Sequence, residues 1–159
     1  MRIRPALESE APALSALALE AKQYWPYSPE DIERWRPLLV VTAADIAANP
    51  TFVAELDDAV VGFYLLVPDP KAWVLEHLWV SPSVARRGIG KALVAHAVTT
   101  ARSAGISSIV IDADPNAEPF YLACGAVREG VIAAPIGSDA ARVRPQLLLT
   151  VRDCPVSPT

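Results

Sequence analysis

The chain has 159 residues, with 14 basic and 18 acidic side chains that give a net charge of −4. This length suits one compact domain, and the weakly acidic balance disfavours nucleic acid or an anionic membrane as a partner. No apolar run approaches the roughly 20 residues of a membrane span, and the first residues lack the apolar stretch of a signal peptide. We therefore predict one cytoplasmic domain over residues 1–152 and a flexible tail over residues 153–159.

The first fifty residues predict one strand and then helices. Residues 2–6 fit a short strand, and apolar positions within 14–21 repeat at helical spacing after Ser9, which we interpret as the helix cap. The stretch 28–31, SPED, combines a capping serine, a first-turn proline and early acidic residues, so a second helix begins there. Residues 42–48 add one or two helical turns.

The rest of the chain alternates between strand and helix patterns. Three apolar runs between residues 52 and 80 are separated by DD and PDP turns, which predicts an antiparallel meander. The elements that follow are a glycine turn, a helix ending near Gly105, a buried strand at 107–113, a short helix closed by Gly125, and strands at 126–131 and 146–151. The order predicts an α/β (α+β) fold, with a mixed, mostly antiparallel sheet of about six or seven strands and about four helices.

Residues 86–94, RRGIGKALV, place two glycines between basic residues at the start of a helix. A helix start presents unpaired N–H groups at the positive end of the helix dipole, and glycine lets a phosphate approach the backbone. A P-loop is excluded, because Ala85 stands where its first glycine is needed and Ala92 where its hydroxyl is needed. A dinucleotide fingerprint lacks its third glycine at Leu93, and an ordinary tight turn is the other alternative.

Two sequence motifs, one helix and one strand apart, resemble those of a known family. Residues 87–92 read R-x-x-G-x-[GA] after a strand ending LWVSP, and residues 114–126, DPNAEPFYLACGA, place an asparagine before a helix with F-Y-x-x-x-G. In both, the chain resembles the GNAT superfamily of acyl-CoA-dependent N-acetyltransferases, although Ala126 stands where the family usually has an aromatic residue. The resemblance implies a sheet that splits at the fourth strand, with acetyl-CoA as co-substrate in the split and no metal.

The same resemblance implies which residues contact the cofactor. Main-chain N–H groups of the glycine turn would hold the pyrophosphate, and the edge of the preceding strand would face the pantetheine and the acetyl carbonyl. The implied cofactor-binding residues are Arg87, Gly88, Ile89, Gly90, Lys91 and Ala92 in the turn, Leu78, Trp79 and Val80 in the strand, and Asn116 before the second motif's helix.

Acetyl transfer to an amine needs a base and an acid. An alkyl amine with a pKa of about 10 is mostly ammonium at pH 7, so it must lose a proton before it can attack, and a proton donor helps the thiolate to leave. Tyr121 occupies the tyrosine position of F-Y-x-x-x-G and is the expected acid, because a phenol stays protonated at pH 7. The alternative is a core tyrosine with a satisfied hydroxyl.

Glu76 is the predicted base. Strand alternation puts Glu76 on one face with Leu78, where apolar neighbours and partial burial would raise the pKa of the carboxyl. His77 points the other way with Leu75 and Trp79, and it would serve instead if a bulge shifted the register. The third alternative is a water relay or no dedicated base.

The resemblance also implies that the segment joining the first two helices, the aromatic residues 22–35, lines the acceptor side. Arg142 and Arg144 either hold an acceptor carboxylate or form a solvated basic pair, and Cys124 and Cys154 are interpreted as free thiols. We predict direct transfer of an acetyl group to a primary amine of a small molecule or peptide. An exposed terminal strand could pair two copies of the protein into a homodimer. The alternatives are a non-catalytic acyl-CoA-binding module and a small dinucleotide-binding oxidoreductase.

Overall fold

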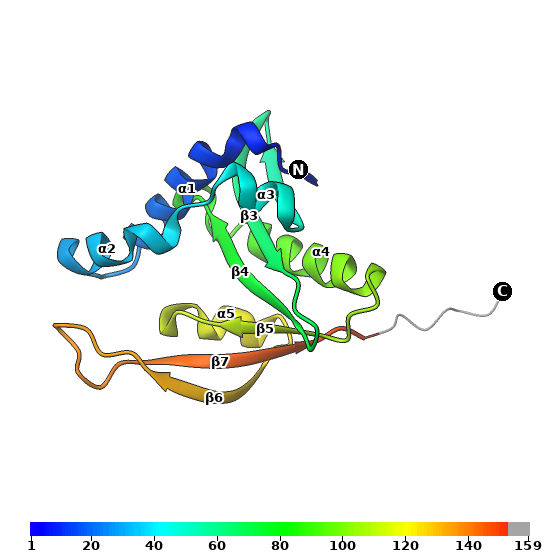
Figure 1. Ribbon diagram of the computed structural model, residues 1–159. Helices are drawn as coiled ribbons and strands as arrows, with labels where there is room; N and C mark the ends of the chain where they lie inside the picture. The colour runs from blue at the N-terminus through cyan, green and yellow to red at the C-terminus, as the bar shows by residue number, and fades with distance from the viewer. Residues whose placement is uncertain (153–159) are drawn as a thin grey trace.

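Seven strands form one sheet in the computed structural model, which describes residues 1–152 (Figure 1). The strand order is β1-β2-β3-β4-β5-β7-β6, and every neighbouring pair is antiparallel except β4 with β5. The strands are β1 (Arg2–Pro5), β2 (Thr51–Leu56), β3 (Ala59–Val67), β4 (Trp73–Val80), β5 (Ser108–Asp112), β6 (Val127–Ala133) and β7 (Val143–Thr150). The mixed, mostly antiparallel sheet is confirmed, and the predicted tail lies outside the described residues.

Helices cover both faces of this sheet. They are α1 (Ala11–Gln23), α2 (Pro29–Trp35), α3 (Ala43–Ala48), α4 (Ile89–Ser103) and α5 (Glu118–Ala123), with 3₁₀ turns at Glu8–Glu10, Arg36–Leu39, Pro82–Val84 and Pro115–Ala117. Phe63 and Tyr64 are adjacent in β3 and therefore enter opposite cores, Phe63 with Leu14 of α1 and Tyr64 with Leu93 of α4. Within residues 1–152, no helix has the length and apolar character that crossing a membrane requires.

The first two helices begin differently. The predicted start of α2 is confirmed, because Ser28 Oγ accepts the Asp31 N–H at 3.1 Å. The predicted Ser9 cap of α1 is wrong, because Ser9 lies within a 3₁₀ turn in which the Glu10 carboxylate accepts the Leu7 N–H at 2.8 Å. This turn takes the place of a serine cap, and α1 begins only at Ala11.

A β-bulge in β4 decides which of its side chains face each core. Leu65 pairs with His77 and Leu66 with Leu75, so Glu76 has no partner in β3. The extra residue reverses the alternation of side chains beyond it. Leu75 packs on the α4 face and His77 on the α1 face, so the predicted alternation, which placed both on one face, is wrong at this point.

Among the residues that the structure describes, only two pairs join the two halves of the sheet, Trp73 with Ile109 and Val74 with Val110. Beyond these pairs β4 and β5 diverge, so the predicted split at the fourth strand is confirmed. The lower half in Figure 1 contains β5, β7 and β6. β7 begins at Val143 rather than at the predicted residue 146, because its first residues pair with β6 beyond the end of β5.

Candidate active site

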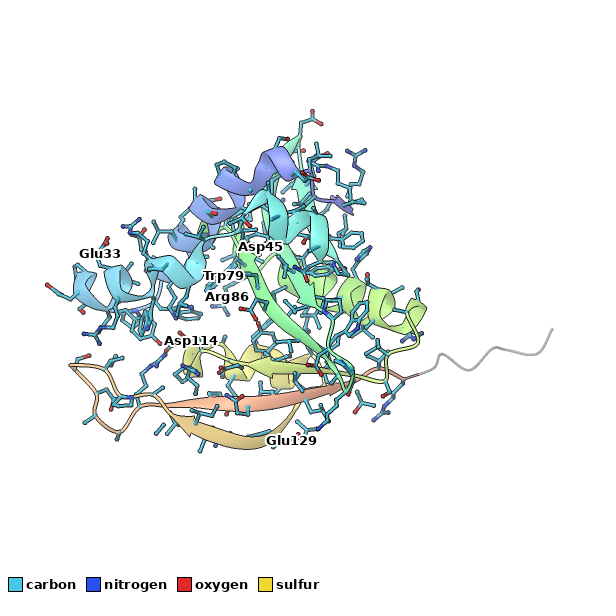
Figure 2. The ribbon with its side chains drawn as sticks, viewed as in Figure 1. Glu33, Asp45, Trp79, Arg86, Asp114 and Glu129 are labelled. Atoms are coloured by element: carbon cyan, nitrogen blue, oxygen red, sulfur yellow. The ribbon has the colours of Figure 1, made fainter. Side chains whose placement is uncertain are left out.

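A cleft of about 870 Å³ opens where β4 and β5 diverge. Its walls come from both halves of the sheet, the start of α4, the region from the end of β5 into α5, and the segment after α1. Figure 2 shows Trp79, Arg86 and Asp114, all of which line this cleft. Both predicted catalytic residues, Glu76 and Tyr121, line it as well.

The glycine turn forms the N-terminus of α4 at this cleft. Gly88 is the N-cap, with a φ of 80° that favours glycine. The Ala92 N–H donates to the Gly88 carbonyl at 3.1 Å, so the N–H groups of the three residues between them have no partner within the helix. These donors stand at the positive end of a 15-residue helix and therefore suit an anion.

The six turn positions implied for the pyrophosphate differ in their placement. Four of them line the cleft, namely Gly88, Ile89, Gly90 and Lys91. Arg87 and Ala92 do not line it, and the N–H of Ala92 is already engaged in the helix. Arg86, which was not predicted, does line it, in a left-handed conformation with a φ of 64° that is uncommon for a residue other than glycine.

The end of β4 offers a free backbone edge to the cleft. Leu78, Trp79 and Val80 line the cleft and pair with β3 on one side only, because pairing with β5 stops at Val74. Backbone groups of a strand point alternately to its two edges, so the β5 side of this stretch presents donors and acceptors that the sheet does not use.

Tyr121 reaches the cleft from α5. Its side chain is 8% exposed, and burial raises the pKa of the phenol well above its usual value, with smaller contributions from Cys124 and Asp114. The hydroxyl therefore keeps its proton throughout the neutral range.

Glu76 lines the cleft at the bulge of β4, but its environment differs from the prediction. The side chain is exposed rather than partly buried among apolar neighbours, because the bulge takes this residue out of the regular alternation. The prediction that Glu76 acts as the base now depends on its position in the cleft, not on burial.

His77, the alternative base, lies in the core and does not line the cleft. Its ring centroid is 5.9 Å from that of Phe63, and its Nδ1 accepts the indole N–H of Trp79 at 3.0 Å. Burial lowers the pKa of His77, and Asp45 opposes this shift. The bulge that His77 needed for its role is present, but it turns the ring toward α1.

Asn116 lines the cleft with its amide group held by neighbouring side chains. Nδ2 donates to the Tyr27 hydroxyl and to Asp114 Oδ1, each at 3.0 Å, and the backbone N–H donates to the same carboxylate at 2.9 Å. Because both amide hydrogens are engaged, the carbonyl oxygen is the group that Asn116 can offer to a cofactor.

A polar cluster that we did not predict lies around Asp114. Lys22 Nζ is 2.6 Å from Asp114 Oδ2, the Tyr27 hydroxyl donates to that oxygen at 2.8 Å, and Arg142 donates to the Tyr27 hydroxyl at 3.2 Å. Lys22 Nζ lies 4.4 Å and Arg142 Cζ 5.2 Å from the ring centroid of Trp35. We call Lys22, Tyr27, Trp35, Asp114 and Arg142 the Asp114 cluster.

Charge and burial act against each other in this cluster. Burial acts to raise the pKa of Asp114, but the Lys22 ammonium and the hydrogen bonds lower it below its usual value. Burial lowers the pKa of Lys22, which Asp114 opposes. Arg142 is buried rather than solvated, and Arg144 pairs with Asp112 at 2.9 Å.

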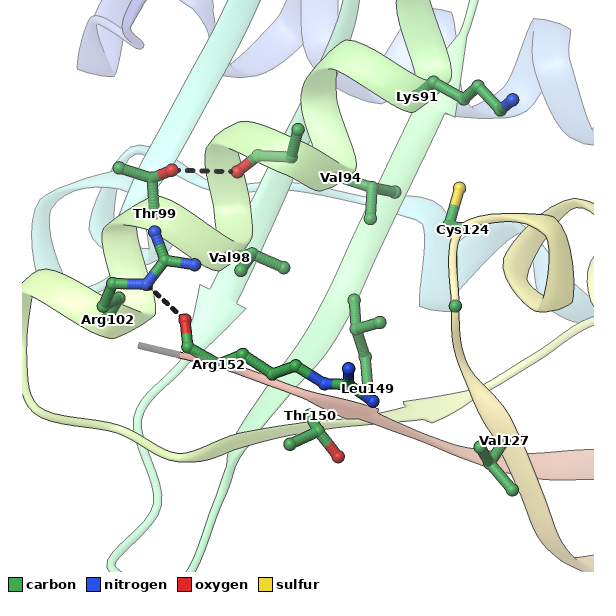
Figure 3. A pocket seen from close by; sticks show the side chains of 12 residues that line it. Lys91, Val94, Val98, Thr99, Arg102, Cys124, Val127, Leu149, Thr150 and Arg152 are labelled. Atoms are coloured by element: carbon green, nitrogen blue, oxygen red, sulfur yellow. Dashed lines mark hydrogen bonds between the residues drawn. The ribbon is translucent and has the colours of Figure 1, made fainter. Parts of the chain in front are cut away.

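A second groove, of about 720 Å³, lies between α4 and β7, away from the split (Figure 3). Lys91, Arg102 and Arg152 line it, and Arg102 Nε donates to the Arg152 carbonyl at 2.8 Å. Cys124 also lines it as a free thiol, as predicted, with a pKa raised by burial, whereas Cys154 lies outside the described residues. Neither predicted catalytic residue, Glu76 or Tyr121, lines this groove.

The split of the sheet, the N-terminus of α4 and the buried Tyr121 meet at this one cleft. A model of the acetyltransferase (GNAT) family matches residues 13–126. The chain belongs to this family, which confirms the resemblance of its two motifs.

Solved structures share the fold. A GCN5-related N-acetyltransferase from Rhodopseudomonas palustris is 23% identical over 94% of each chain, with a TM-score of 0.76. The PaiA N-acetyltransferase from Thermoplasma acidophilum, in complex with coenzyme A, is 20% identical over 94% of this chain and 98% of that chain, with a TM-score of 0.71. A ribosomal-protein-alanine N-acetyltransferase from Brucella melitensis is 21% identical over 94% of this chain and 99% of that chain, with a TM-score of 0.67. No curated protein matches.

Proposed function

We propose that this chain transfers an acetyl group from acetyl-CoA directly to a primary amine. The observation that carries the proposal is the single cleft that holds an anion-binding helix N-terminus, a protonated tyrosine at Tyr121 and an exposed carboxylate at Glu76. Membership of the acetyltransferase (GNAT) family supports the same activity.

The start of α4 suits the diphosphate of acetyl-CoA. The N–H groups from Gly88 to Lys91 would donate to it. Apart from Gly88 and its neighbours along the chain, no atom lies within 4 Å of the place that a Cβ of Gly88 would occupy, so the approach is open. The free edge at 78–80 would bond the pantetheine, and the carbonyl oxygen of Asn116 would accept one more hydrogen bond. The coenzyme A complex of the Thermoplasma protein, which has the same fold, supports this assignment.

The side chains of the cleft meet the demands of the reaction. Glu76 would take a proton from the ammonium group of the acceptor, directly or through water, which restores the nitrogen lone pair. The nitrogen attacks the thioester carbonyl, a C–N bond forms, and an N–H of the β4 edge stabilises the oxyanion. The oxyanion then re-forms the carbonyl as the C–S bond breaks, sulfur leaves with the electron pair of that bond, and Tyr121 protonates it. The nitrogen sheds its remaining excess proton to solvent, Glu76 releases to solvent the proton that it took, and solvent returns one proton to Tyr121.

Release of the CoA thiol in the presence of a panel of amines tests this function. We expect thiol release that depends on an accepted amine, and Tyr121→Phe should lower kcat by about 10²–10⁴-fold. The Kd for CoA, measured by calorimetry, should stay nearly unchanged. Tyr64→Phe is the matched control, because Tyr64 is a buried tyrosine outside the cleft that hydrogen-bonds His96 at 2.7 Å.

Two other results would contradict the proposal. Tight CoA binding without thiol release for any amine would favour the non-catalytic acyl-CoA-binding module. Binding of NADH without affinity for CoA would favour the dinucleotide-binding oxidoreductase.

The acceptor would enter beside Tyr24 and Trp25, which line the cleft from the segment after α1. Aromatic faces attract ammonium groups, so this wall suits an amine. The Brucella protein is named for a protein alanine, so the panel should contain peptide N-termini as well as small amines.

We also propose a cytoplasmic homodimer that uses the exposed edge strand β6, which sedimentation velocity would test.

A further inference from the structure

Asp114 contacts three segments that surround the cleft. Its carboxylate bonds Lys22 of α1 at 2.6 Å, Tyr27 of the segment between α1 and α2 at 2.8 Å, and the backbone N–H of Asn116 at 2.9 Å. A fourth segment, the loop between β6 and β7, brings Arg142 to 3.7 Å from the same carboxylate. Of these side chains, only Asp114 and Asn116 line the cleft.

The backbone hydrogen bonds of the segment between α1 and α2 are all local, including that of the Tyr27 N–H to the Trp25 carbonyl at 2.8 Å, so they do not tie the segment to the far side of the cleft. The backbone bonds of Tyr24 to Ala21 and of Trp25 to Lys22 are both long, at 3.3 Å, and Pro26 has no N–H to donate. Tyr27 anchors the segment instead, through the Asp114 carboxylate and through an edge contact with Trp35 whose ring centroids are 4.7 Å apart. Tyr24 and Trp25 therefore reach the cleft from a segment that side chains hold in place.

The charges of the cluster make its single carboxylate indispensable. The Lys22, Asp114 and Arg142 side chains are 10%, 11% and 6% exposed, so two cations share one anion with little water. Removing the carboxylate leaves two buried cations without a counter-charge, which is strongly unfavourable. The cations would then separate, and the segment that carries Tyr27 would move with them.

We propose that Asp114 is a positioning residue for acetyl transfer, which fixes the acceptor wall of Tyr24 and Trp25 relative to Asn116 and the start of α5. This inference rests on the proposed function. Asp114 acts through Lys22 and Tyr27 and exchanges no proton with the substrates.

Asp114→Asn tests the proposal, because it removes the charge and keeps the shape of the side chain. We expect kcat/KM for the amine to fall about 10²-fold, mainly through a higher KM for the amine. The Kd for CoA should rise by less than the KM for the amine, because Asn116 is the one proposed CoA contact that Asp114 holds. Glu55→Gln is the matched control, since Glu55 is another carboxylate held by two cations, Arg2 at 2.9 Å and Arg4 at 2.8 Å, far from the cleft.

Hydrogen exchange gives a second readout that does not need turnover. The amides of Tyr24, Trp25 and Tyr27 should exchange faster in Asp114→Asn than in Glu55→Gln, even if the wild-type chain shows no acetyl transfer. Tyr27→Phe, a milder change, should give part of the same kinetic effect and add little to Asp114→Asn in the double variant. If Asp114→Asn and Glu55→Gln had equal effects on the KM for the amine and on hydrogen exchange, the proposal would be overturned. If the wild type released no thiol but the two variants still differed in hydrogen exchange, only the proposed function would be overturned.

Discussion

Gly90 and Phe120 meet so closely that a Cβ on the glycine would lie 3.1 Å from Cζ of the ring. Gly90 belongs to the turn at the start of α4 and Phe120 to α5, so the two motifs found in the sequence are in direct contact in the folded chain. Gly90 does not share the positive φ of Gly88. Its lack of a side chain therefore serves packing, whereas Gly88 serves backbone conformation.

Gly90→Ala should lower the free energy of unfolding by about 1–3 kcal/mol, because the Phe120 ring must move to admit the methyl group. Alanine favours a helix more than glycine does, so helix propensity alone would raise stability at this position. A loss of stability would therefore report the contact with Phe120. Urea unfolding measures the change, and adding Phe120→Leu to Gly90→Ala should recover part of it. A Gly90→Ala variant as stable as the wild type would contradict the packing role.

Gly88→Ala should cost about 1–2 kcal/mol of stability through backbone strain. Gly105→Ala is its matched control, because the φ angles are 80° and 75° and neither site has an atom within 4 Å of the added methyl group. Both variants should unfold at lower urea concentrations than the wild type, by similar amounts. Only Gly88→Ala should weaken CoA binding in calorimetry, and equal CoA affinities in the two variants would contradict the anion site at the start of α4.

Glu76→Gln should leave stability nearly unchanged, because the side chain is exposed at the bulge of β4. It should lower kcat/KM for the amine by about 10²–10⁴-fold, because the group that takes the proton from the ammonium is lost. Glu129→Gln is the control, since Glu129 is an exposed glutamate at the bulge of β6, outside the cleft. If a Glu76→Gln variant had wild-type kinetics at every pH, a water relay rather than Glu76 would take the proton from the ammonium group of the acceptor.

His77 should make the protein less stable below about pH 6.5. Burial lowers its pKa in the folded state, so the unfolded chain binds more protons as the pH falls through 6.5 toward the folded pKa, and the free energy of unfolding decreases over that window. His77→Gln cannot titrate, so its melting temperature should depend less steeply on pH between about 7.5 and 5. Identical slopes for the two proteins would show that His77 does not titrate on unfolding.

Local patterns were enough to predict the strands, the start of α4 and the family. The DD and PDP turns bounded the meander, and R-x-x-G-x-[GA] identified the helix N-terminus at the cleft. The surroundings of Glu76 could not be predicted in this way. They depend on the register between β3 and β4, and alternation along one strand holds no information about an unpaired residue.

The Asp114 cluster could not be predicted for a different reason. Its members come from residues 22 to 35, from 114 and from 142, so no sequence spacing connects them. One signal was present, because Lys22 stands beside the apolar position Ala21 on α1, and it is buried there. A lysine at such a position requires a partner, but only the tertiary structure identifies Asp114 as that partner.

Because β4 and β5 pair over so short a stretch, the sheet behaves as two halves connected by one short hinge. Each half of the sheet, one with β1 to β4 and the other with β5, β6 and β7, has its own ladder of hydrogen bonds, which bulges interrupt. Within residues 1–152, only the pairs at Trp73 and Val74 connect the two ladders. The gap can therefore widen or narrow by a small rotation about this hinge without breaking a ladder on either side. The core that α4 shares with both halves opposes such a rotation, whereas the hydrogen-bond ladders do not.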